Sequence, residues 1–405
     1  MKRLLKFLGC IMSLVSLVFS VSYSQKIEAI KGVRIIHNGE RGTWGKNPRI
    51  SLRFIKTIGE LDADDENVAF YFPSDISFDS QGNLYILDSG NHRIQKFDSQ
   101  GRYIATIGGK GQGPAEFYFP LSLDVDSGGY LYISDPGNQR IQVLNPEGKE
   151  HKTIRIIKAP MGVLRISESS NMIMGSGGGF FGFLSGGLSQ EATPLKIIRV
   201  IGLDGKIKRY FGEGFDYKDI LVNRKGNRFH FTIDREENTY IALDYQNRIE
   251  KYSPDGKILW RADRELNYSI TVPKGKSSFK RSGERVVIRD PMMNKCSSGV
   301  AIDDKGRIWI VALKRQMKEE ESIQTGIRAM RGAGGERSTS ISLSGNVDVL
   351  ETDMYQLEVY SSDGILLGKI PLNIFVDDIW IEKDRLFLLD QMRGMQFHEY
   401  KIIDN

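Results

Sequence analysis

The chain has 405 residues, of which 56 are Lys or Arg, 51 are Asp or Glu and two are Cys. This nearly balanced charge identifies no polyanionic partner, and two cysteines without a CxxC pair exclude a Cys-based structural zinc site. The length allows two or three domains or one large repeat fold, so internal patterns have to decide between them.

Residues 1–24 predict a secretory signal peptide. Three basic residues fall within the first six positions, an apolar run follows from Phe7 to Val21, and 22–24 offer small residues suited to cleavage. The run of about 15 apolar residues is shorter than the roughly 20 that span a bilayer. We therefore expect export to the periplasm or the extracellular space, with no transmembrane segment after cleavage near Ser24. Retention as a membrane anchor is the alternative.

Cleavage changes the cysteine and charge counts. Cys10 leaves with the leader, so Cys296 is the single thiol of the mature chain and can form no internal disulfide. Three of the 56 basic residues also leave, so that 53 basic side chains face 51 acidic ones. Lipid attachment at Cys10 is a weaker alternative, because most of the apolar run follows Cys10, whereas a lipobox would place it before.

A repeat of 47 residues organises the first part of the mature chain. Two segments of the same pattern begin at Phe72-Pro73 and Phe119-Pro120. Each contains four short runs in which apolar and polar residues alternate, separated by Gly, Asn, Asp and Ser. Four strands per repeat are typical of a propeller blade.

Fainter copies complete a ring of six blades. Residues 230–263 have the same four runs, whereas the copies that begin at Gly162 and Gly299 are split by insertions. The last copy, from Val376, has only three strands, and residues 51–59 match a fourth strand without partners of its own. Because an unpaired sheet edge invites aggregation, we expect 51–59 to pair beside 394–402 and close the ring. Seven blades are the main competitor.

The predicted fold is therefore all-β. It consists of a lead segment at 25–50 and a six-bladed β-propeller at 51–405, in which an N-terminal strand completes the last blade.

The turns of three repeats carry a shared motif of Asp, then Asn, then Arg-Ile. It is formed by Asp88, Asn91 and Arg93, by Asp135, Asn138 and Arg140, and, with one spacing shortened by a residue, by Asp244, Asn247 and Arg248. These segments resemble NHL repeats, and the whole pattern resembles the secreted bacterial six-bladed propellers of that type, whose members mostly lack a defined activity. Because the motif recurs, we interpret it as structural: Asp and Asn shape the turn, and Arg bridges neighbouring strands.

The expected strand order places every long connection on one face. With strands a to d counted outward from the axis, the a–b and c–d turns are short, whereas the long segments are b–c or d–a connections. Loops on a rigid scaffold are where binding residues concentrate. We therefore expect the b–c/d–a face to be the working surface.

Three insertions on this face are candidate binding elements. The d–a link at 264–297 carries Lys276, Lys280, Arg281, Arg285 and Arg289, and the b–c insertion of blade 3 carries Phe180, Phe181 and Phe183. The three Phe residues would form either a lid over the channel or simple packing on the face. The b–c insertion of blade 5, at about 314–354, is polar and glycine-rich, which favours disorder until a partner orders it. Solvated loop surface is the plain alternative for the basic link.

Signatures of catalysis are weaker. The five histidines do not recur at equivalent blade positions. The sequence therefore does not indicate a three-His zinc site like that of amidating-lyase propellers. A calcium-dependent lactonase-like or esterase-like site would need acids that project into the channel, and Asp75, Asp124 and Asp377 lie near inner strands. Fixation of these acids by backbone amides is the alternative. The sequence contains no nucleophile elbow and no phosphate-cradling loop.

We expect a monomeric, non-catalytic binding or scaffolding propeller of the cell envelope or extracellular space, without a cofactor. Its partner would be a protein or an anionic glycan on the b–c/d–a face, and not a nucleic acid, since the protein is exported. A calcium- or zinc-dependent hydrolase or lyase with its site at the channel mouth is the alternative.

Overall fold

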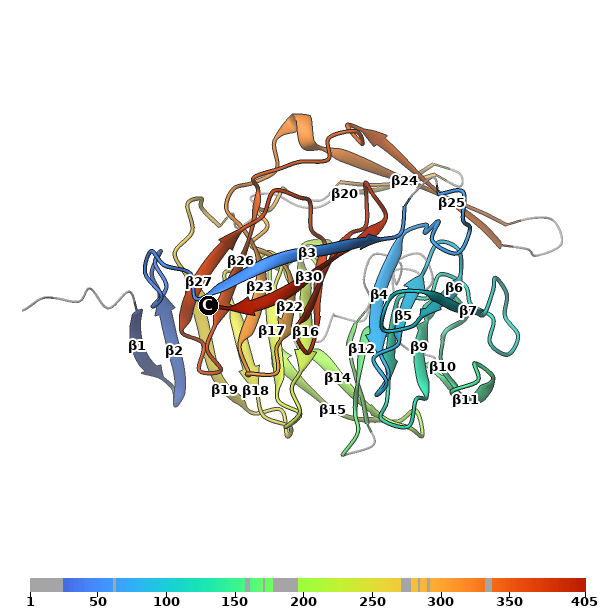
Figure 1. Ribbon diagram of the computed structural model, residues 1–405, viewed down its shortest axis with the longest axis horizontal. Helices are drawn as coiled ribbons and strands as arrows, with labels where there is room; N and C mark the ends of the chain where they lie inside the picture. The colour runs from blue at the N-terminus through green and yellow to red at the C-terminus, as the bar shows by residue number, and fades with distance from the viewer. Residues whose placement is uncertain are drawn as a thin grey trace, which may run out of the picture.

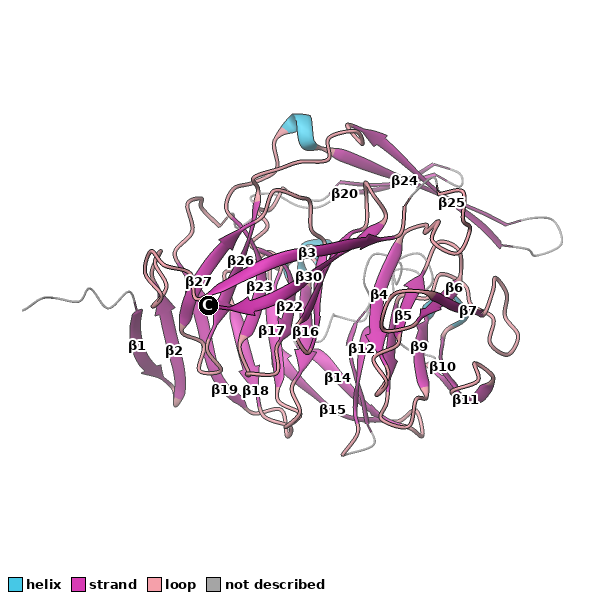
Figure 2. Cartoon of the chain, in the orientation of Figure 1, coloured by secondary structure: helices cyan, strands magenta, loops and turns pink. Residues whose placement is uncertain are grey.

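Six sheets stand around a common axis as the blades of a β-propeller (Figure 1). This computed structural model describes residues 25–60, 63–156, 161–169, 172–177, 196–270, 278–282, 285–289, 292–331 and 337–405. Strands dominate, and helix is limited to three short pieces in these ranges (Figure 2). None of the helices described is long and apolar enough to span a membrane.

The first three blades follow one another along the chain. Blade 1 contains β4 (Pro73–Phe78), β5 (Leu84–Asp88), β6 (Arg93–Phe97) and β7 (Tyr103–Ile107). Blade 2 contains β8 (Ser122–Val125), β9 (Leu131–Asp135), the 3₁₀ turn η1 (Pro136–Asn138), β10 (Arg140–Leu144) and β11 (Glu150–Arg155). Blade 3 contains β12 (Met161–Ser167), β13 (Met172–Gly177), β14 (Lys196–Gly202) and β15 (Ile207–Glu213).

The last three blades carry the additional elements. Helix α2 (Ile220–Gly226) leads into blade 4, which contains β16 (Phe229–Ile233), β17 (Thr239–Leu243), β18 (Ile249–Tyr252) and β19 (Ile258–Arg264). A hairpin of β20 (Ser278–Ser282) and β21 (Arg285–Arg289) precedes blade 5, which contains β22 (Ser297–Ile302), β23 (Ile308–Leu313), β26 (Tyr355–Tyr360) and β27 (Leu366–Pro371). Blade 6 contains β28 (Asp378–Glu382), β29 (Arg385–Asp390), β30 (Gln396–Asp404) and β3 (Ile50–Ile58).

The hydrophobic core lies in wedges between adjacent blades. The second strand of a blade has a neighbouring blade on both sides, and accordingly β5, β9, β17 and β23 are buried along their whole length. Between blades 6 and 1, for example, Ile76 packs against Trp380, Phe387 and Phe397. Strands buried on both faces read as nearly continuous apolar runs, which is why these were readable in the sequence.

The predicted ring closure is confirmed. Strand β3 pairs antiparallel with β30, from Ile50 opposite Asp404 to Ile58 opposite Phe397. Ile50 and Ile58 are buried, so the first strand of the propeller contributes to the core on both sides of the closing blade. The six-blade prediction is likewise confirmed.

The lead segment at 25–50 forms structure that the sequence did not indicate. β1 (Gln25–Ile30) and β2 (Val33–Asn38) form a hairpin whose turn, Lys31-Gly32, has two positive φ angles. β2 adds parallel to β19 and extends blade 4 to six strands. The Asn38 amide donates to Gly364 O at 3.0 Å and accepts from Leu366 N at 2.8 Å, so this segment also bonds to blade 5.

The expected disorder of the blade 5 insertion is wrong. The insertion contains the 3₁₀ turn η2 (Glu319–Glu321) and a hairpin of β24 (Ile323–Arg331) and β25 (Arg337–Gly345). At its base the Arg315 guanidinium donates to both Glu321 oxygens, at 2.7 and 2.5 Å, and to Asp353 at 2.7 Å. The bond from Arg315 to Asp353 joins the two ends of the insertion, a constraint that composition does not reveal.

The same hairpin reaches across the face to other blades. Ile341 of β25 packs with Phe72, Phe119 and Met395, which precede or belong to blades 1, 2 and 6. The Tyr71 hydroxyl donates to Ile341 O at 2.8 Å. Figure 1 shows β20, β24 and β25 together at one rim, as expected for the b–c/d–a face.

We predict that Ile58→Ala lowers the free energy of unfolding by about 2–5 kcal/mol, because it leaves a cavity where β3 closes the ring. Urea titration at neutral pH measures this loss. Ile55→Ala, in the same strand but with the side chain 44 % exposed, should change it by about 0.5 kcal/mol or less. Equal effects of the two substitutions would show that β3 does not close the core.

We predict that Glu321 makes the insertion acid-sensitive. Its hydrogen bond from Arg315 lowers the pKa of Glu321 from 4.5 to about 2, against the opposing effect of burial. A depressed carboxyl pKa stabilises the fold above the unfolded value, and that stabilisation is lost as pH falls through the folded value. The difference in unfolding free energy between the native chain and Glu321→Gln should therefore be present at pH 7 and shrink from about pH 4.5 to about pH 2.

The matched control is Glu320→Gln, since the Glu320 side chain is 66 % exposed. At pH 7, amide hydrogen exchange over 323–345 should quicken in Glu321→Gln and stay unchanged in Glu320→Gln. Native exchange rates in Glu321→Gln would show that the Arg315–Glu321 ion pair does not hold the hairpin in place.

Candidate functional site

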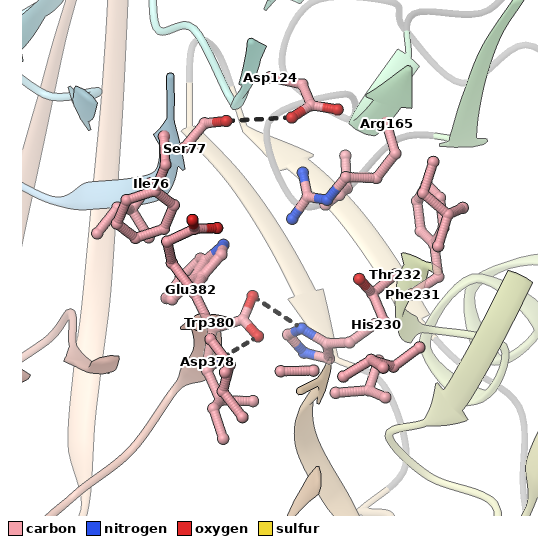
Figure 3. A pocket seen from close by; sticks show the side chains of 18 of the residues that line it. Ile76, Ser77, Asp124, Arg165, His230, Phe231, Thr232, Asp378, Trp380 and Glu382 are labelled. Atoms are coloured by element: carbon pink, nitrogen blue, oxygen red, sulfur yellow. Dashed lines mark hydrogen bonds and ion pairs between the residues drawn. The ribbon is translucent and has the colours of Figure 1, made fainter. Parts of the chain in front are cut away.

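The innermost strands of all six blades enclose a cavity of about 280 Å³ on the propeller axis. Five of the side chains in its walls are ionisable: Asp124, Arg165, His230, Asp378 and Glu382 (Figure 3). They come from β8, β12, β16 and β28. Each is mounted on a sheet and not on a loop, which holds functional groups in a fixed geometry.

Asp75 lies buried beside the cavity and joins four blades. Its Oδ1 accepts hydrogen bonds from Ile76 N at 2.9 Å and Trp380 Nε1 at 3.0 Å. Its Oδ2 accepts from Ser122 Oγ at 2.5 Å, Leu123 N at 3.0 Å and Arg165 Nη1 at 3.1 Å. Both oxygens thus already have protein donors, as expected of a structural crosslink.

Asp124 lines the cavity, whereas Asp377 does not. Asp124 accepts from Ile166 N at 2.8 Å and from Ser77 Oγ at 3.1 Å. Burial raises the pKa of Asp124, although Arg165 acts in the opposite direction. Asp377 accepts from Gln391 N at 3.0 Å, at the b–c turn of blade 6.

The calcium site considered from the sequence does not fit this geometry. Asp75 is saturated by protein donors, and Asp377 lies outside the cavity wall. Within the ranges that the structure describes, no three His, Cys, Asp or Glu side chains are grouped so as to hold a metal ion.

Arg165 brings a positive charge to the cavity wall. Its Nη1 donates to Asp75 Oδ2 at 3.1 Å and to Leu164 O at 2.7 Å. Burial disfavours the charged guanidinium, but Asp75 and Asp124 outweigh this effect and raise the pKa of Arg165.

His230 is held between two carboxylates. Its Nδ1 lies 3.0 Å from Asp378 Oδ2, and its Nε2 lies 3.5 Å from Asp244 Oδ1. Only the imidazolium carries a proton on both ring nitrogens and can face both acceptors favourably. Burial alone would lower the pKa of His230, but Asp378 and Asp244 outweigh it and raise the pKa.

Glu382 differs from the other acids of the wall because it has little protein bonding. Among the described residues no hydrogen bond to its carboxylate is found, and its ion-pair contact is Lys383 Nζ at 3.8 Å. Burial raises the pKa of Glu382, with Lys383 acting against it. Phe78 and Trp380 line the same cavity.

The repeat motif has the predicted structural role in blades 1 and 2. Asp88 Oδ2 accepts from Arg93 Nε at 2.8 Å and from Asn91 Nδ2 at 2.9 Å, while Arg93 Nη2 donates to Ala69 O of the preceding link at 3.1 Å. Asp135, Asn138 and Arg140 repeat this arrangement. The Arg therefore ties the b–c turn to the d–a link that precedes the blade.

The third copy departs from this pattern. Asn247 Nδ2 donates to Arg264 O at 2.5 Å, and Arg248 Nε pairs with Glu250 at 3.1 Å, not with Asp244. Asp244 pairs instead with His230 and with Arg228 Nε at 3.5 Å. Arg248 thus does not pair with the Asp of its own motif as Arg93 and Arg140 do, because the shortened spacing moves it next to Glu250.

The candidates on the b–c/d–a face are only partly described. Lys280, Arg281, Arg285 and Arg289 lie on the β20–β21 hairpin, with Lys280 opposite Val287 and Arg281 opposite Val286. The positions of their side chains lie outside the described part of the structure, as do Lys276, Phe180, Phe181 and Phe183 altogether. Their binding role stays a prediction.

Sequence reasoning missed Arg165, His230, Asp378 and Glu382. Charged residues inside strands expected at the axis were the available signal. For blade 6 the chosen residue is off by one: Asp377 precedes β28 and lies outside the cavity wall, whereas Asp378, the first residue of β28, lines it.

Comparison with known proteins supports the architecture. Residues 70–97 match the family model of the NHL repeat. No curated protein matches the sequence significantly.

The first two of the following solved structures share the fold at low sequence identity. A member of the DUF4221 family from Bacteroides vulgatus is 11 % identical, with a TM-score of 0.54 over 88 % of this chain and 99 % of that one. A protein from Bacteroides fragilis is also 11 % identical, with a TM-score of 0.53 over 92 % and 99 %. A gluconolactonase from Xanthomonas campestris is 14 % identical, with a TM-score of 0.47 over 87 % and 99 %. The chain is thus a six-bladed β-propeller with an NHL repeat in its first blade.

Proposed function

We propose that this protein is an exported, non-catalytic binding propeller that holds a small polar ligand in its central channel. The observation that carries the proposal is the cavity of about 280 Å³ whose wall contains ionisable side chains from four blades. Protein interiors are close-packed and seldom leave voids much larger than a water molecule.

The chemistry of the wall supports a binding role. Charged groups are costly to keep away from bulk water unless they are paired, and strongly perturbed groups in a cavity are candidates for functional sites. The wall nevertheless contains Asp124, Asp378 and Glu382 as well as two cations. These groups offer donors and acceptors to a polar guest from several directions.

Binding is favoured over catalysis by the way His230 is held. Asp378 and Asp244 face its two ring nitrogens and raise the pKa of His230, which disfavours the neutral form that could accept a proton. Arg165 is likewise engaged by Asp75. His230 is thus committed to ion pairs and is a poor general base, whereas the carboxylate of Glu382 keeps little protein bonding.

We predict that a panel of sugars, amines, amino acids and carboxylates contains a ligand with a Kd of about 1 mM or tighter, and that Thr232→Phe weakens it at least tenfold. Thr232 lines the cavity (Figure 3), so a phenyl ring there would occupy the ligand's space. Calorimetry on the full mature chain measures both affinities.

Thr57→Phe is the matched control, since Thr57 is exposed on β3. Thermal unfolding of both variants verifies that they fold. Binding that survives Thr232→Phe would place the ligand elsewhere, and a panel without any ligand would contradict the proposed function.

A second candidate site is the b–c/d–a face, for a protein or an anionic glycan. The observation in its favour is that both hairpins unnecessary to the ring, β20–β21 and β24–β25, lie at this rim (Figure 1). The β20–β21 hairpin carries four of the five basic residues singled out in the sequence.

We predict that replacing Lys280, Arg281 and Arg285 by Gln weakens capture on immobilised acidic polysaccharide, because it removes three positive charges. The loss should be larger at about 10 mM than at about 150 mM salt, since the Debye length shrinks from ~30 to ~8 Å. Replacing the exposed Lys149, Lys152 and Arg155 of blade 2 by Gln is the charge-matched control. Equal loss in both triple variants would indicate nonspecific attraction only.

A further inference from the structure

The charges around the channel do not cancel. Asp75 pairs with Arg165, Asp378 pairs with His230, and Arg228 lies 3.5 Å from Asp244. Among the described residues that line or adjoin the cavity, these three pairs leave two carboxylates over: Asp124 and Glu382. Arg165 acts on Asp124 without an ion pair to it, and the contact of Glu382 is with Lys383 Nζ at 3.8 Å, a residue outside the cavity lining. No cation of that lining therefore lies at ion-pair distance from either carboxylate.

Two further observations indicate that the channel stabilises positive charge. His230 has an acceptor within 3.5 Å of each ring nitrogen, and Asp378 and Asp244 raise its pKa although its side chain is only 19 % exposed. Behind it, Asp244 Oδ1 is buried without a hydrogen bond, so even the paired carboxylates are not fully satisfied. A cationic guest would gain from this potential, whereas an anion would meet repulsion.

The aromatic part of the wall suits an organic cation. Phe78 and Trp380 line the cavity together with Asp124 and Glu382. Ammonium and guanidinium groups are attracted to the faces of aromatic rings, more strongly where water is excluded. Their alkyl portions also pack against apolar side chains such as Val125 and Ile302, which belong to the same wall.

A bare divalent ion fits this wall less well. Calcium requires six to eight oxygen ligands within about 2.6 Å. Asp124 directs its oxygens to Ser77 and to the backbone N–H groups of Val125 and Ile166. Over the ranges that the structure describes, no third acidic or His side chain joins two others in a metal-binding arrangement.

We infer that the channel binds a small organic cation with a primary ammonium or guanidinium group, held between Asp124 and Glu382 and against Phe78. This inference rests on the proposed function of the channel and adds the chemical class of the ligand. Of the two carboxylates, Glu382 is the better probe, because it has no hydrogen bond within the described structure whose loss would disturb the fold.

The test is calorimetric titration of the mature chain with butylammonium and butylguanidinium. Butanol, butyrate and Ca²⁺ serve as the neutral, anionic and metal comparators. We expect a cation to bind, and Glu382→Gln to weaken it about tenfold through loss of one charge at the guest. Glu147→Gln, at an exposed turn of blade 2, should leave the affinity unchanged. Asp124→Asn should act as Glu382→Gln does, provided that its thermal unfolding is normal.

The outcomes separate the ligand class from the channel function. Binding of butanol or butyrate, but not of the cations, and its loss in Thr232→Phe would overturn the cation inference and leave the channel function standing. Calcium binding that depends on Glu382 without binding of either organic cation would overturn it in favour of a metal. Absence of binding by any compound of this panel and of the broader panel would overturn both.

Discussion

The pairing of β3 with β30 is the contact on which the rest of the structure depends. A ring of blades avoids an unpaired strand edge where it closes only when its first and last segments share one sheet. Here that pairing begins with Ile50 opposite Asp404. The lead segment connects two further blades, since β2 pairs with β19 of blade 4 and Asn38 hydrogen-bonds to blade 5. Closure fixes each innermost strand at the axis, and only then do side chains from separate blades face one another across one cavity.

Asp75 connects the blades at the axis, as the β3–β30 pairing connects them where the ring closes. Donors from blades 1, 2, 3 and 6 meet on one buried carboxylate. Removing one partner of a buried ion pair typically costs about 3–5 kcal/mol, because the other charge stays buried. Asp75 therefore fixes four blades relative to one another around the axis, and its ion pair with Arg165 is part of this connection. The side chains of the cavity wall are held in place by the same bonds.

The repeat predicted the ring because its signal is local and periodic. Alternation and turn residues predicted the blade pattern, the closing of the ring by the N-terminal strand, and the face that carries the insertions. Contacts between segments far apart in sequence were not predicted: the parallel addition of β2 to β19 and the Arg315–Asp353 contact between the two ends of the blade 5 insertion have no periodic trace. The cavity residues were missed for a third reason, since the sequence does not show at which residue β28 begins, and its first residue, Asp378, lines the cavity whereas Asp377 does not.

The most informative residues are those at which a repeat departs from its own rule. In blades 1 and 2 the turn Asp is neutralised by the Arg five residues later. In blade 4 the shortened spacing sends Arg248 to Glu250, and Asp244 is left to pair with His230 and Arg228. Natural sequences tend to break local consistency at functional sites. A change of one residue in the b–c turn thus leaves Asp244 without the Arg partner of the other copies and free to pair with His230, and Asp378 and Asp244 together raise the pKa of this imidazole at the wall of the channel.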